Sequence, residues 1–399
     1  MKILISGTAG TGGWPAPDCG CASCARVTPG RRPVSVVLDV PAASDNPATP
    51  GGPVAPDGPV APDGLARLPL SGSLPPGYHA SVGPDGLTVT TPGGRRVLHA
   101  ISPSHGEPPD GEPSGDGRGL PAEDTGGGAG EAVDLVLLDV LDRPERLGDL
   151  RRRGLVGERT HVVAVGADHR VPTEAELARR AALWGVRVVP DGTVVDTGEP
   201  PPARVPPPRR TLLLGGSRSG KSAEAELRLA AEPEVLYVAT GPSGDGDPEW
   251  LRRVRAHRDR RPAHWRTVES VDLAGLLRSA DTPLLIDGLG TWVAAVFDEC
   301  DAWPGDDGST REDGNGRDGR DGRDGRDAVA ARCDDLVAAW RQTRVRVVAV
   351  SDEVGLGVVP GTAGGRVFRD ALGRLNQRLA LESEEVALVV AGRLLPLPV

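Results

Sequence analysis

One eight-residue segment, GGSRSGKS at residues 215–222, constrains the fold of this 399-residue chain more than any other feature. It follows the apolar run TLLL directly and precedes a stretch rich in Ala, Glu and Leu, so a strand, a glycine turn and a helix are expected in succession. The backbone amides of such a turn wrap phosphate oxygens, and the helix offers its positive N-terminus. The alternative is a chance glycine-rich turn, and the flanking strand and helix patterns weigh against it. The segment therefore predicts a nucleotide-phosphate site.

Three side chains of this site can be assigned roles from their chemistry. Lys221 is expected to reach the terminal phosphates and Ser222 to bind Mg²⁺. Lys2 and Lys221 are the only lysines among 46 basic residues, so a lysine at this position has a chemical explanation. Asp287 follows the apolar run PLLI, where a carboxylate on a second strand would hold the magnesium ion or its water. The expected nucleotide contacts of the loop are Gly215, Gly216, Ser217, Arg218, Ser219, Gly220, Lys221 and Ser222.

Apolar runs alternate with helical patterns over residues 209–399. Continuous apolar runs favour buried parallel strands, and the alternation predicts a three-layer α/β domain with a mostly parallel sheet. The expected strands are 212–214, 235–238, 284–286, 345–350 and 386–390, and the expected helices are 222–231, 248–257, 328–342 and 365–381.

Low-complexity segments divide the chain. Residues 53–64 repeat PVAPDG, residues 104–131 are rich in Gly, Pro, Glu and Asp, and residues 305–327 end in four GRD triplets, so we expect two solvated loops and a flexible insertion. The segment GEPPPARVPPP at 198–208 is expected to be extended, because proline fixes the backbone and removes donors. It separates an N-terminal domain, 1–197, from a C-terminal domain, 209–399.

Charge and the N-terminal sequence exclude several classes of function. The net charge of −10 and the pI near 5.3 lack the basic footprint of a general nucleic-acid binder. The apolar run in MKILISG is ILI, three residues, far short of a signal peptide or a membrane span. The sequence predicts a cytoplasmic protein with no nucleic-acid partner and no membrane span.

Four motifs occur in an order that resembles one family. GGSRSGKS is followed by VLYVATG at 235–241, by RVRAHRDRRPAHWRTVE at 253–269 and by the block from VVAVSDEVG to ALVVAG at 347–392. This order is similar to the bifunctional adenosylcobinamide kinase and adenosylcobinamide-phosphate guanylyltransferase family. The resemblance implies a RecA-like fold and a homo-oligomer. It also implies phosphorylation of adenosylcobinamide by ATP or GTP, then GMP transfer from GTP to adenosylcobinamide phosphate to give adenosylcobinamide-GDP.

The same resemblance assigns the nucleophile to His257. In the family a histidine attacks the α-phosphorus of GTP and carries GMP, which suits a neutral imidazole near pH 7. Without the resemblance, His257 reads as a surface histidine on a basic helix. His264 is a competing nucleophile, but it lies outside the family's histidine position, beside Trp265, and is expected to be structural. The implied nucleotide contacts are Ala239, Thr240, Gly241, Arg258, Asp259, Arg260, Arg261, Glu269 and Asp287.

The chain departs from the family pattern at one position near the phosphates. The family commonly has Asn before Glu in its S-N-E-V-G motif, whereas this chain has SDEVG with Asp352. The added carboxylate is expected to alter metal or substrate affinity.

The first domain resembles the metallo-β-lactamase fold of phosphodiesterases. ILISGTAGTGGWPAPDCGCASC is similar to its start, and residues 134–196 resemble its closing strands. Hydrolysis in that fold needs an H-x-H-x-D-H cluster that holds two metals, which this chain lacks, and Gly166 stands where a late metal-binding histidine would be. The resemblance implies a degenerate domain that retains a structural zinc site, and free thiols in a loop are the alternative. The implied ligands are Cys19, Cys21, Cys24 and His169.

Two other functions are compatible with the motifs. One is a P-loop kinase or ATPase without guanylyl transfer, in which His257 is a charged helix residue. The other is a metal-binding or corrinoid-binding regulatory module without catalysis, against which the intact Lys221 and Ser222 argue.

Overall fold

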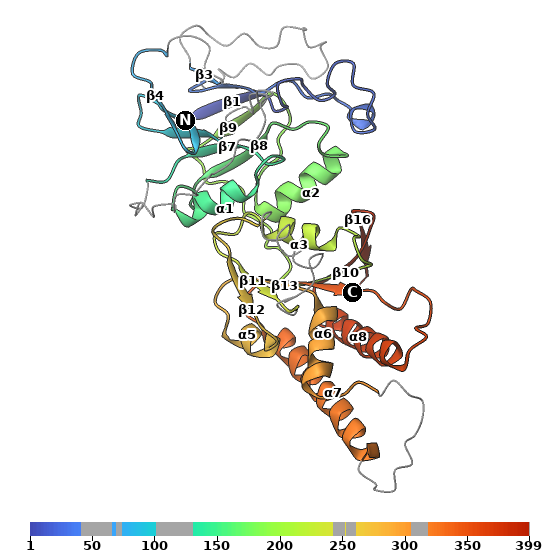
Figure 1. Cartoon of the computed structure of the whole chain (residues 1–399). Coiled ribbons are helices and arrows are strands. Elements are labelled where there is room, and N and C mark those ends of the chain that lie inside the picture. Colours follow the sequence, from blue (N-terminus) through green and yellow to red (C-terminus); the bar gives the residue numbers. More distant parts are fainter. Residues whose placement is uncertain are drawn as a thin grey trace, which may run out of the picture. The chain divides into compact units, whose positions relative to one another are not determined.

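The computed structural model describes residues 1–40, 66–68, 74–100, 131–241, 252, 261–304 and 318–398, with the backbone alone for 318–323. The chain forms two compact units, Met1–Val205 and Pro206–Val399 (Figure 1). The division falls in the proline-rich stretch 198–208. No helix in the described ranges is both long enough and apolar enough to cross a membrane.

Unit 1 contains two sheets in its described residues. The first has the order β3-β2-β1-β9 and is antiparallel throughout. The second has the order β4-β5-β6-β7-β8, in which β4 to β6 are antiparallel and β6 to β8 are parallel. The strands are β1 (Lys2–Gly7), β2 (Ser35–Val37), β3 (Arg67–Leu68), β4 (His79–Gly83), β5 (Gly86–Thr90), β6 (Arg96–Ala100), β7 (Leu135–Asp139), β8 (His161–Val165) and β9 (Thr193–Asp196).

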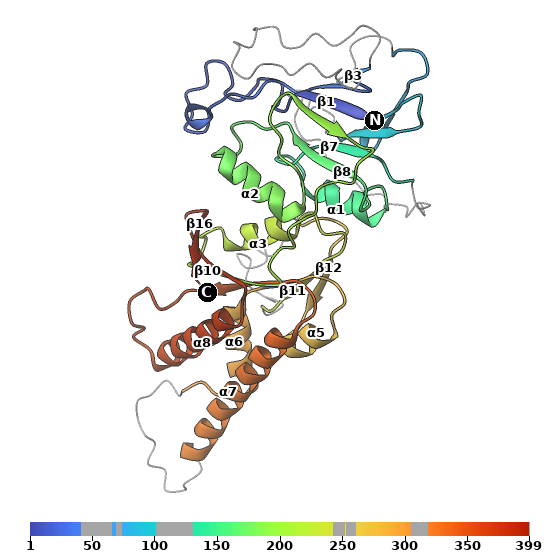
Figure 2. The ribbon, with the colours of Figure 1, turned by 180° about the vertical axis from the view of Figure 1, so that it is seen from behind.

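The two sheets of unit 1 pack face to face. Ile3 and Ile5 of β1 share one buried cluster with Leu135 and Leu137 of β7. Alternate residues of a strand point to opposite faces, so the other face of β7 is available to helices. Helices α1 (Glu145–Arg152) and α2 (Glu174–Trp184) lie on that side, away from β1 (Figures 1 and 2). Unit 1 is a β-sandwich covered by helices on one outer face.

Unit 2 is built on a sheet with the order β12-β11-β13-β14-β10-β15-β16 in the part of the chain that the structure describes. All neighbouring strands from β12 to β15 are parallel, and β16 is antiparallel to β15. The five apolar runs that predict buried strands are confirmed as β10 (Arg210–Gly215), β11 (Leu236–Ala239), β13 (Leu284–Asp287), β14 (Val347–Asp352) and β15 (Glu385–Val390). Two further strands, β12 (Arg266–Glu269) and β16 (Arg393–Leu397), are not predicted by the apolar runs of the sequence.

Helices cover both faces of this sheet. Ala225 and Leu229 of α3 pack with Leu213 and Leu285 on one face. The other face carries α5, α6, α7 and α8 in a second cluster. The helices are α3 (Lys221–Leu229), α5 (Leu273–Ser279), α6 (Leu289–Glu299), α7 (Asp318–Gln342) and α8 (Ala363–Leu381). The three-layer arrangement follows, and the helix expected at 248–257 lies outside the described residues apart from residue 252.

Helix α7 begins earlier than the sequence pattern predicts. It starts at Asp318, so residues 318–327, which were expected to belong to a flexible insertion, are helical, and that part of the expectation is wrong. Gly325 explains how these turns dock. A Cβ at this position would lie 2.7 Å from the carbonyl oxygen of Cys300 and 3.3 Å from the Cα of Ala302, so glycine permits a close approach to the end of α6. The remainder of the insertion, 305–317, lies outside the described residues.

Candidate active site at the phosphate loop

The turn between β10 and α3 adopts a conformation that requires glycine. Gly220 has φ of 100°, and a Cβ there would lie 3.2 Å from the Cα of Gly392. A Cβ at Gly215 would lie 2.7 Å from the carbonyl oxygen of Val389. The Gly392 N–H donates to the Ser219 carbonyl at 2.7 Å, which ties the loop to the turn after β15. The glycines of the motif therefore serve the path of the backbone.

Lys221 lies across this loop and contacts two acceptors. Its Nζ donates to the Gly216 carbonyl at 3.0 Å and is 2.9 Å from Asp352 Oδ1. Asp352 ends β14 and lies in register with Gly215 of β10. The Asn376 side chain donates to the Asp352 carbonyl at 3.1 Å, which fixes the backbone at this point. The residue that departs from the family pattern is thus in direct contact with Lys221, the lysine expected to reach the phosphates.

Ser222 and Asp287 lie together as the sequence predicts for a magnesium site. The Ser222 hydroxyl donates to Asp287 Oδ1 at 2.9 Å. The other carboxylate oxygen, Oδ2, accepts a hydrogen bond from the Tyr237 hydroxyl. Hydroxyl and carboxylate oxygens are the hard donors that Mg²⁺ prefers, so the donor set fits this ion. The two residues reach the site from the first turn of α3 and from the end of β13.

The neighbouring strand β11 ends at the same edge of the sheet. Thr240 Oγ1 donates to the Gly288 carbonyl at 2.6 Å and lies 2.7 Å from Thr291 Oγ1 at the start of α6. Gly288 has φ of 113°. Ala239 pairs in register with Glu269 on one side and with Asp287 on the other. The predicted contacts Ala239, Thr240 and Glu269 therefore line the carboxyl edge of the parallel strands with Asp287.

Comparison with known proteins decides which P-loop enzyme this is. A family model described as cobinamide kinase / cobinamide phosphate guanyltransferase matches residues 211–397. The bifunctional adenosylcobalamin biosynthesis protein CobU of Salmonella typhimurium LT2 is 37% identical over 185 residues, which cover 45% of this chain and 95% of that protein. The chain belongs to this family. The corresponding protein CobP of Pseudomonas aeruginosa PAO1 is 41% identical over 195 residues, covering 47% of this chain and 96% of that protein.

Family membership establishes a bifunctional enzyme of cobalamin biosynthesis, with kinase and guanylyltransferase activities. Among solved structures, an ATPase of a bacterial type III secretion system aligns with a TM-score of 0.28 at 12% identity. The alignment covers 45% of this chain and 50% of that chain.

The segment that carries the family's histidine is described in part. His257, Arg258, Asp259 and Arg260 lie outside the described residues. Arg261 is described, and its guanidinium carbon lies 3.3 Å from the centroid of the Tyr237 ring. The competing histidine, His264, donates from Nε2 to the Glu232 carbonyl at 3.3 Å, a contact in keeping with the structural role expected for it.

Tyr237 is a site residue that the sequence analysis did not single out. It lies within the motif VLYVATG, where it reads as one more apolar residue of a buried strand. The available signal was a hydroxyl in an otherwise aliphatic run, because a buried tyrosine hydroxyl usually has a hydrogen-bond partner. Here the partner is Asp287.

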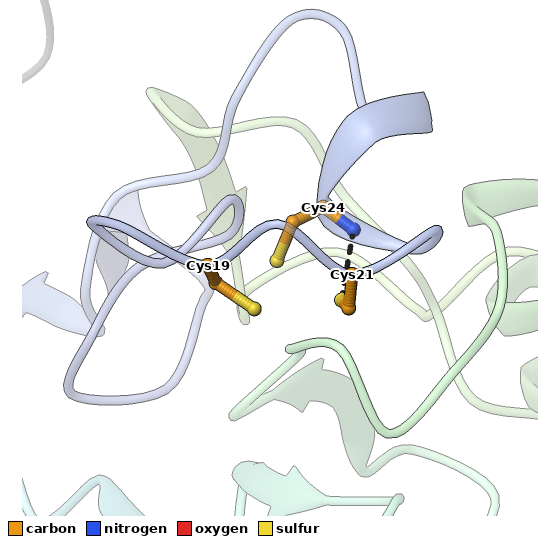
Figure 3. A group of neighbouring side chains, drawn as sticks. All are labelled: Cys19, Cys21 and Cys24. Atoms are coloured by element: carbon orange, nitrogen blue, oxygen red, sulfur yellow. Dashed lines mark hydrogen bonds between the residues drawn. The ribbon is translucent and has the colours of Figure 1, made fainter.

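Unit 1 brings the three N-terminal cysteines together (Figure 3). The sulfur atoms of Cys19, Cys21 and Cys24 lie within 4.8 Å of one another, and within the described ranges no histidine or carboxylate joins the group. His169 is thus placed outside the cluster. The Cys24 N–H donates to the Cys21 sulfur at 3.4 Å and lowers the pKa of that thiol. Three thiols in this arrangement fit a zinc ion, with a fourth ligand still to be supplied.

The cysteine loop and the loop that carries His169 are linked by hydrogen bonds. Ser23 Oγ donates to the Val171 carbonyl at 2.6 Å and accepts from Trp14 Nε1 at 3.1 Å. Both Trp14 and Ser23 are buried. A histidine two residues before Val171 is therefore carried by a segment that is anchored beside the cysteines.

Proposed function

We propose that residues 206–399 perform both steps at the phosphate loop, using the residues that this edge of the sheet brings together. In the kinase step the hydroxyl oxygen of adenosylcobinamide attacks the γ-phosphorus of ATP or GTP and loses its proton, and the bond to the β–γ bridging oxygen breaks to release ADP or GDP. Lys221 and the loop amides would hold the phosphates, and Ser222 and Asp287 would hold Mg²⁺. The supporting observation is that Lys221, Ser222 and Asp287 all lie within the region matched by the family model. Ser222 contacts Asp287, and Lys221 contacts Asp352 at the end of the neighbouring strand.

In the guanylyl step we assign the nucleophile to His257. Its ring nitrogen attacks the α-phosphorus of GTP, pyrophosphate leaves, and a phosphate oxygen of adenosylcobinamide phosphate then displaces the histidine to give adenosylcobinamide-GDP. Arg258, Arg260 and Arg261 offset the phosphate charge, and Asp259, Gly241 and Glu269 complete the nucleotide contacts. The support is the family match together with the position of Arg261. Its guanidinium contacts the ring of Tyr237, which lies two residues before Ala239 on β11. Bound Mg²⁺ would neutralise charge on the departing pyrophosphate.

The finer features of the enzyme are proposals as well. We propose a RecA-like core, supported by a sheet in which β14 separates the phosphate-loop strand β10 from β13 with its Asp287. We also propose a cytoplasmic homo-oligomer without a nucleic-acid partner. The net charge of −10 supports the last point, since phosphate binding must then be local.

For unit 1 we propose a degenerate metallo-β-lactamase-like scaffold with a structural zinc ion. The face-to-face sheets with helices outside one of them support the relationship. At the ends of β7 and β8, the Arg170 guanidinium donates to Asp139 and to Asp168, each at 2.9 Å. A Cβ at Gly166 would lie 2.8 Å from the Asp139 carboxylate. The Arg170 guanidinium thus offsets the charge of both carboxylates, which supports a domain without catalytic metal ions at this position.

The guanylyl step is tested by labelling. Purified enzyme and a His257→Ala variant are incubated with Mg²⁺ and GTP labelled at the α-phosphate, then denatured and separated by electrophoresis. We expect acid-labile, base-stable label on the wild type alone. Equal label on both proteins would move the nucleophile elsewhere, with His264 as the first candidate. Absence of label from both, with kinase activity retained, would favour a single-activity kinase.

A further inference from the structure

Tyr237 makes two side-chain contacts that the proposed function does not explain. The residue lies on β11, and its side chain is buried with Trp265 and Leu285. Its hydroxyl donates to Asp287, and its ring face contacts Arg261. These two partners belong to different parts of the proposed active site. Asp287 is part of the proposed magnesium site, whereas Arg261 lies four residues after His257.

The contact with Asp287 fixes the direction of the carboxylate. Tyr237 holds Oδ2 while Ser222 holds Oδ1, so both oxygens are oriented by donors from different elements. Burial and the negative charge of Asp287 raise the pKa of the Tyr237 hydroxyl. The geometry of this hydrogen bond has the phenolic hydroxyl as the donor and the carboxylate oxygen as the acceptor.

The contact with Arg261 holds a positive charge against strands β11 and β12. The guanidinium carbon lies 3.3 Å from the ring centroid, and Nη1 donates to Thr267 Oγ1 at 3.3 Å. Thr267 lies on β12 and pairs in register with Tyr237 of β11, so the guanidinium spans the two strands. Arg261 Nε is buried and has no hydrogen-bond partner among the described residues. The aromatic face is thus a principal contact of this cation.

We propose that Tyr237 is a positioning residue for both reactions, aligning Asp287 for the magnesium-dependent steps through its hydroxyl and holding Arg261 for the guanylyl step through its ring. The inference rests on the proposed role of the segment around His257. It predicts that the hydroxyl and the ring can be removed separately, with different consequences.

Two substitutions separate these contributions. Tyr237→Phe keeps the ring and removes the hydrogen bond, so we expect the Mg²⁺ concentration for half-maximal kinase rate to rise roughly 3- to 10-fold. The rate of guanylylation at saturating Mg²⁺ should stay within about twofold of the wild-type rate, because the ring that contacts Arg261 is retained. Tyr237→Leu removes the ring as well, and its guanylylation rate should fall by a further factor of roughly 10.

A matched variant and a stability measurement complete the test. Arg261→Gln should reproduce the loss of guanylylation while leaving the Mg²⁺ dependence of the kinase step unchanged. All variants are assayed below the onset of thermal unfolding, which is measured for each. Unchanged Mg²⁺ dependence in Tyr237→Phe, or parallel losses of both rates in Tyr237→Phe and Tyr237→Leu that follow the melting temperature, would overturn the proposal. Label retained on His257→Ala would instead refute the role of His257, whatever the Tyr237 variants do.

Discussion

Asp352 contacts the ammonium group of Lys221, the residue that we propose binds the nucleotide phosphates. The carboxylate is 2.9 Å from Nζ, so it would compete with a bound triphosphate for this cation. Asp352→Asn restores the side chain common in the family, so the variant should fold and remain active. We expect ATP and GTP to bind roughly 3- to 10-fold more tightly, because a partly exposed charge that repels phosphate is removed. Isothermal titration calorimetry with the Mg²⁺ complexes measures this.

Glu353→Gln is the matched control for this prediction. It removes the same charge one residue later, where the carboxylate accepts from the Gly355 N–H at 2.9 Å. A similar gain in affinity in both variants would mean that the general negative field near the loop, and not the contact with Lys221, sets the affinity.

His99 makes unit 1 sensitive to acid. The side chain is buried on β6, and burial lowers the pKa of its imidazole to about 4. The unfolded chain takes up the proton near pH 6.5 and the folded chain does not until about pH 4. The contribution of a neutral His99 to the free energy of unfolding is therefore fully present above pH 6.5, and about 3 kcal/mol of it is lost as the pH drops to 4. Denaturant unfolding of unit 1 at pH 7 and pH 4.5 checks this.

His99→Gln is the comparison for the acid effect, since it keeps a polar side chain that does not titrate. The variant should lose stability at pH 7, but its loss between pH 7 and pH 4.5 should be smaller than that of wild type. Equal pH dependence in both proteins would assign the acid sensitivity to other groups.

At the scale of elements, the docking of α7 onto the end of α6 depends on Gly325. A Cβ at this position would come within 2.7 Å of the Cys300 carbonyl oxygen. Gly325→Ala should lower the free energy of unfolding of unit 2 by about 1–3 kcal/mol, because the close approach is lost. Gly373→Ala in α8 is the control, since nothing lies within 4 Å of the added Cβ. It should stabilise by about 0.5–1 kcal/mol through helix propensity. Stabilisation by both would mean that the first turns of α7 do not dock there.

The strands that the sequence predicts most directly are those whose burial is nearly continuous. Strands β10, β13 and β14 are buried at every residue but one, so their apolar runs identify them. β12 is an edge strand, RTVE, with one apolar residue, and β16 contains Pro396, which weakens a strand assignment. Helix α5 has seven residues, too few for a periodic pattern to identify.

The residues of the site also divide into those that local sequence predicts and those that only the fold brings together. Lys221 and Ser222 are predicted because the phosphate loop is local in sequence, and Asp287 because it ends a recognisable strand. Tyr237 is not predicted, since its partners come from residues 24 and 50 positions away and only the folded sheet brings them together. The pairing of Asp352 with Lys221 has the same origin. The parallel strands β10 and β14 bring the start of α3 beside Asp352, which lies 131 positions later in the chain.

At the scale of the whole molecule, the chemistry and the cysteine cluster belong to different units. All described residues assigned to nucleotide binding lie in unit 2, and Cys19, Cys21 and Cys24 lie in unit 1. Replacement of the three cysteines by serine should therefore abolish zinc binding without changing either rate. The zinc content, measured by mass spectrometry of the purified chain, should fall from about one ion per chain to none, since serine does not replace thiolate as a zinc ligand.

The thermal behaviour of this variant distinguishes a structural ion from an accessory one. A structural zinc ion contributes its binding free energy to folding, so the unfolding transition of unit 1 should move to lower temperature while that of unit 2 stays in place. Treatment of the wild type with a strong chelator should produce the same shift. If the kinase or guanylylation rate fell with the zinc content while unit 2 kept its transition, the metal would act on catalysis, and unit 1 could not be regarded as a scaffold alone. Wild-type protein that carries no zinc, with the same transitions as the serine variant, would identify the cluster as three free thiols.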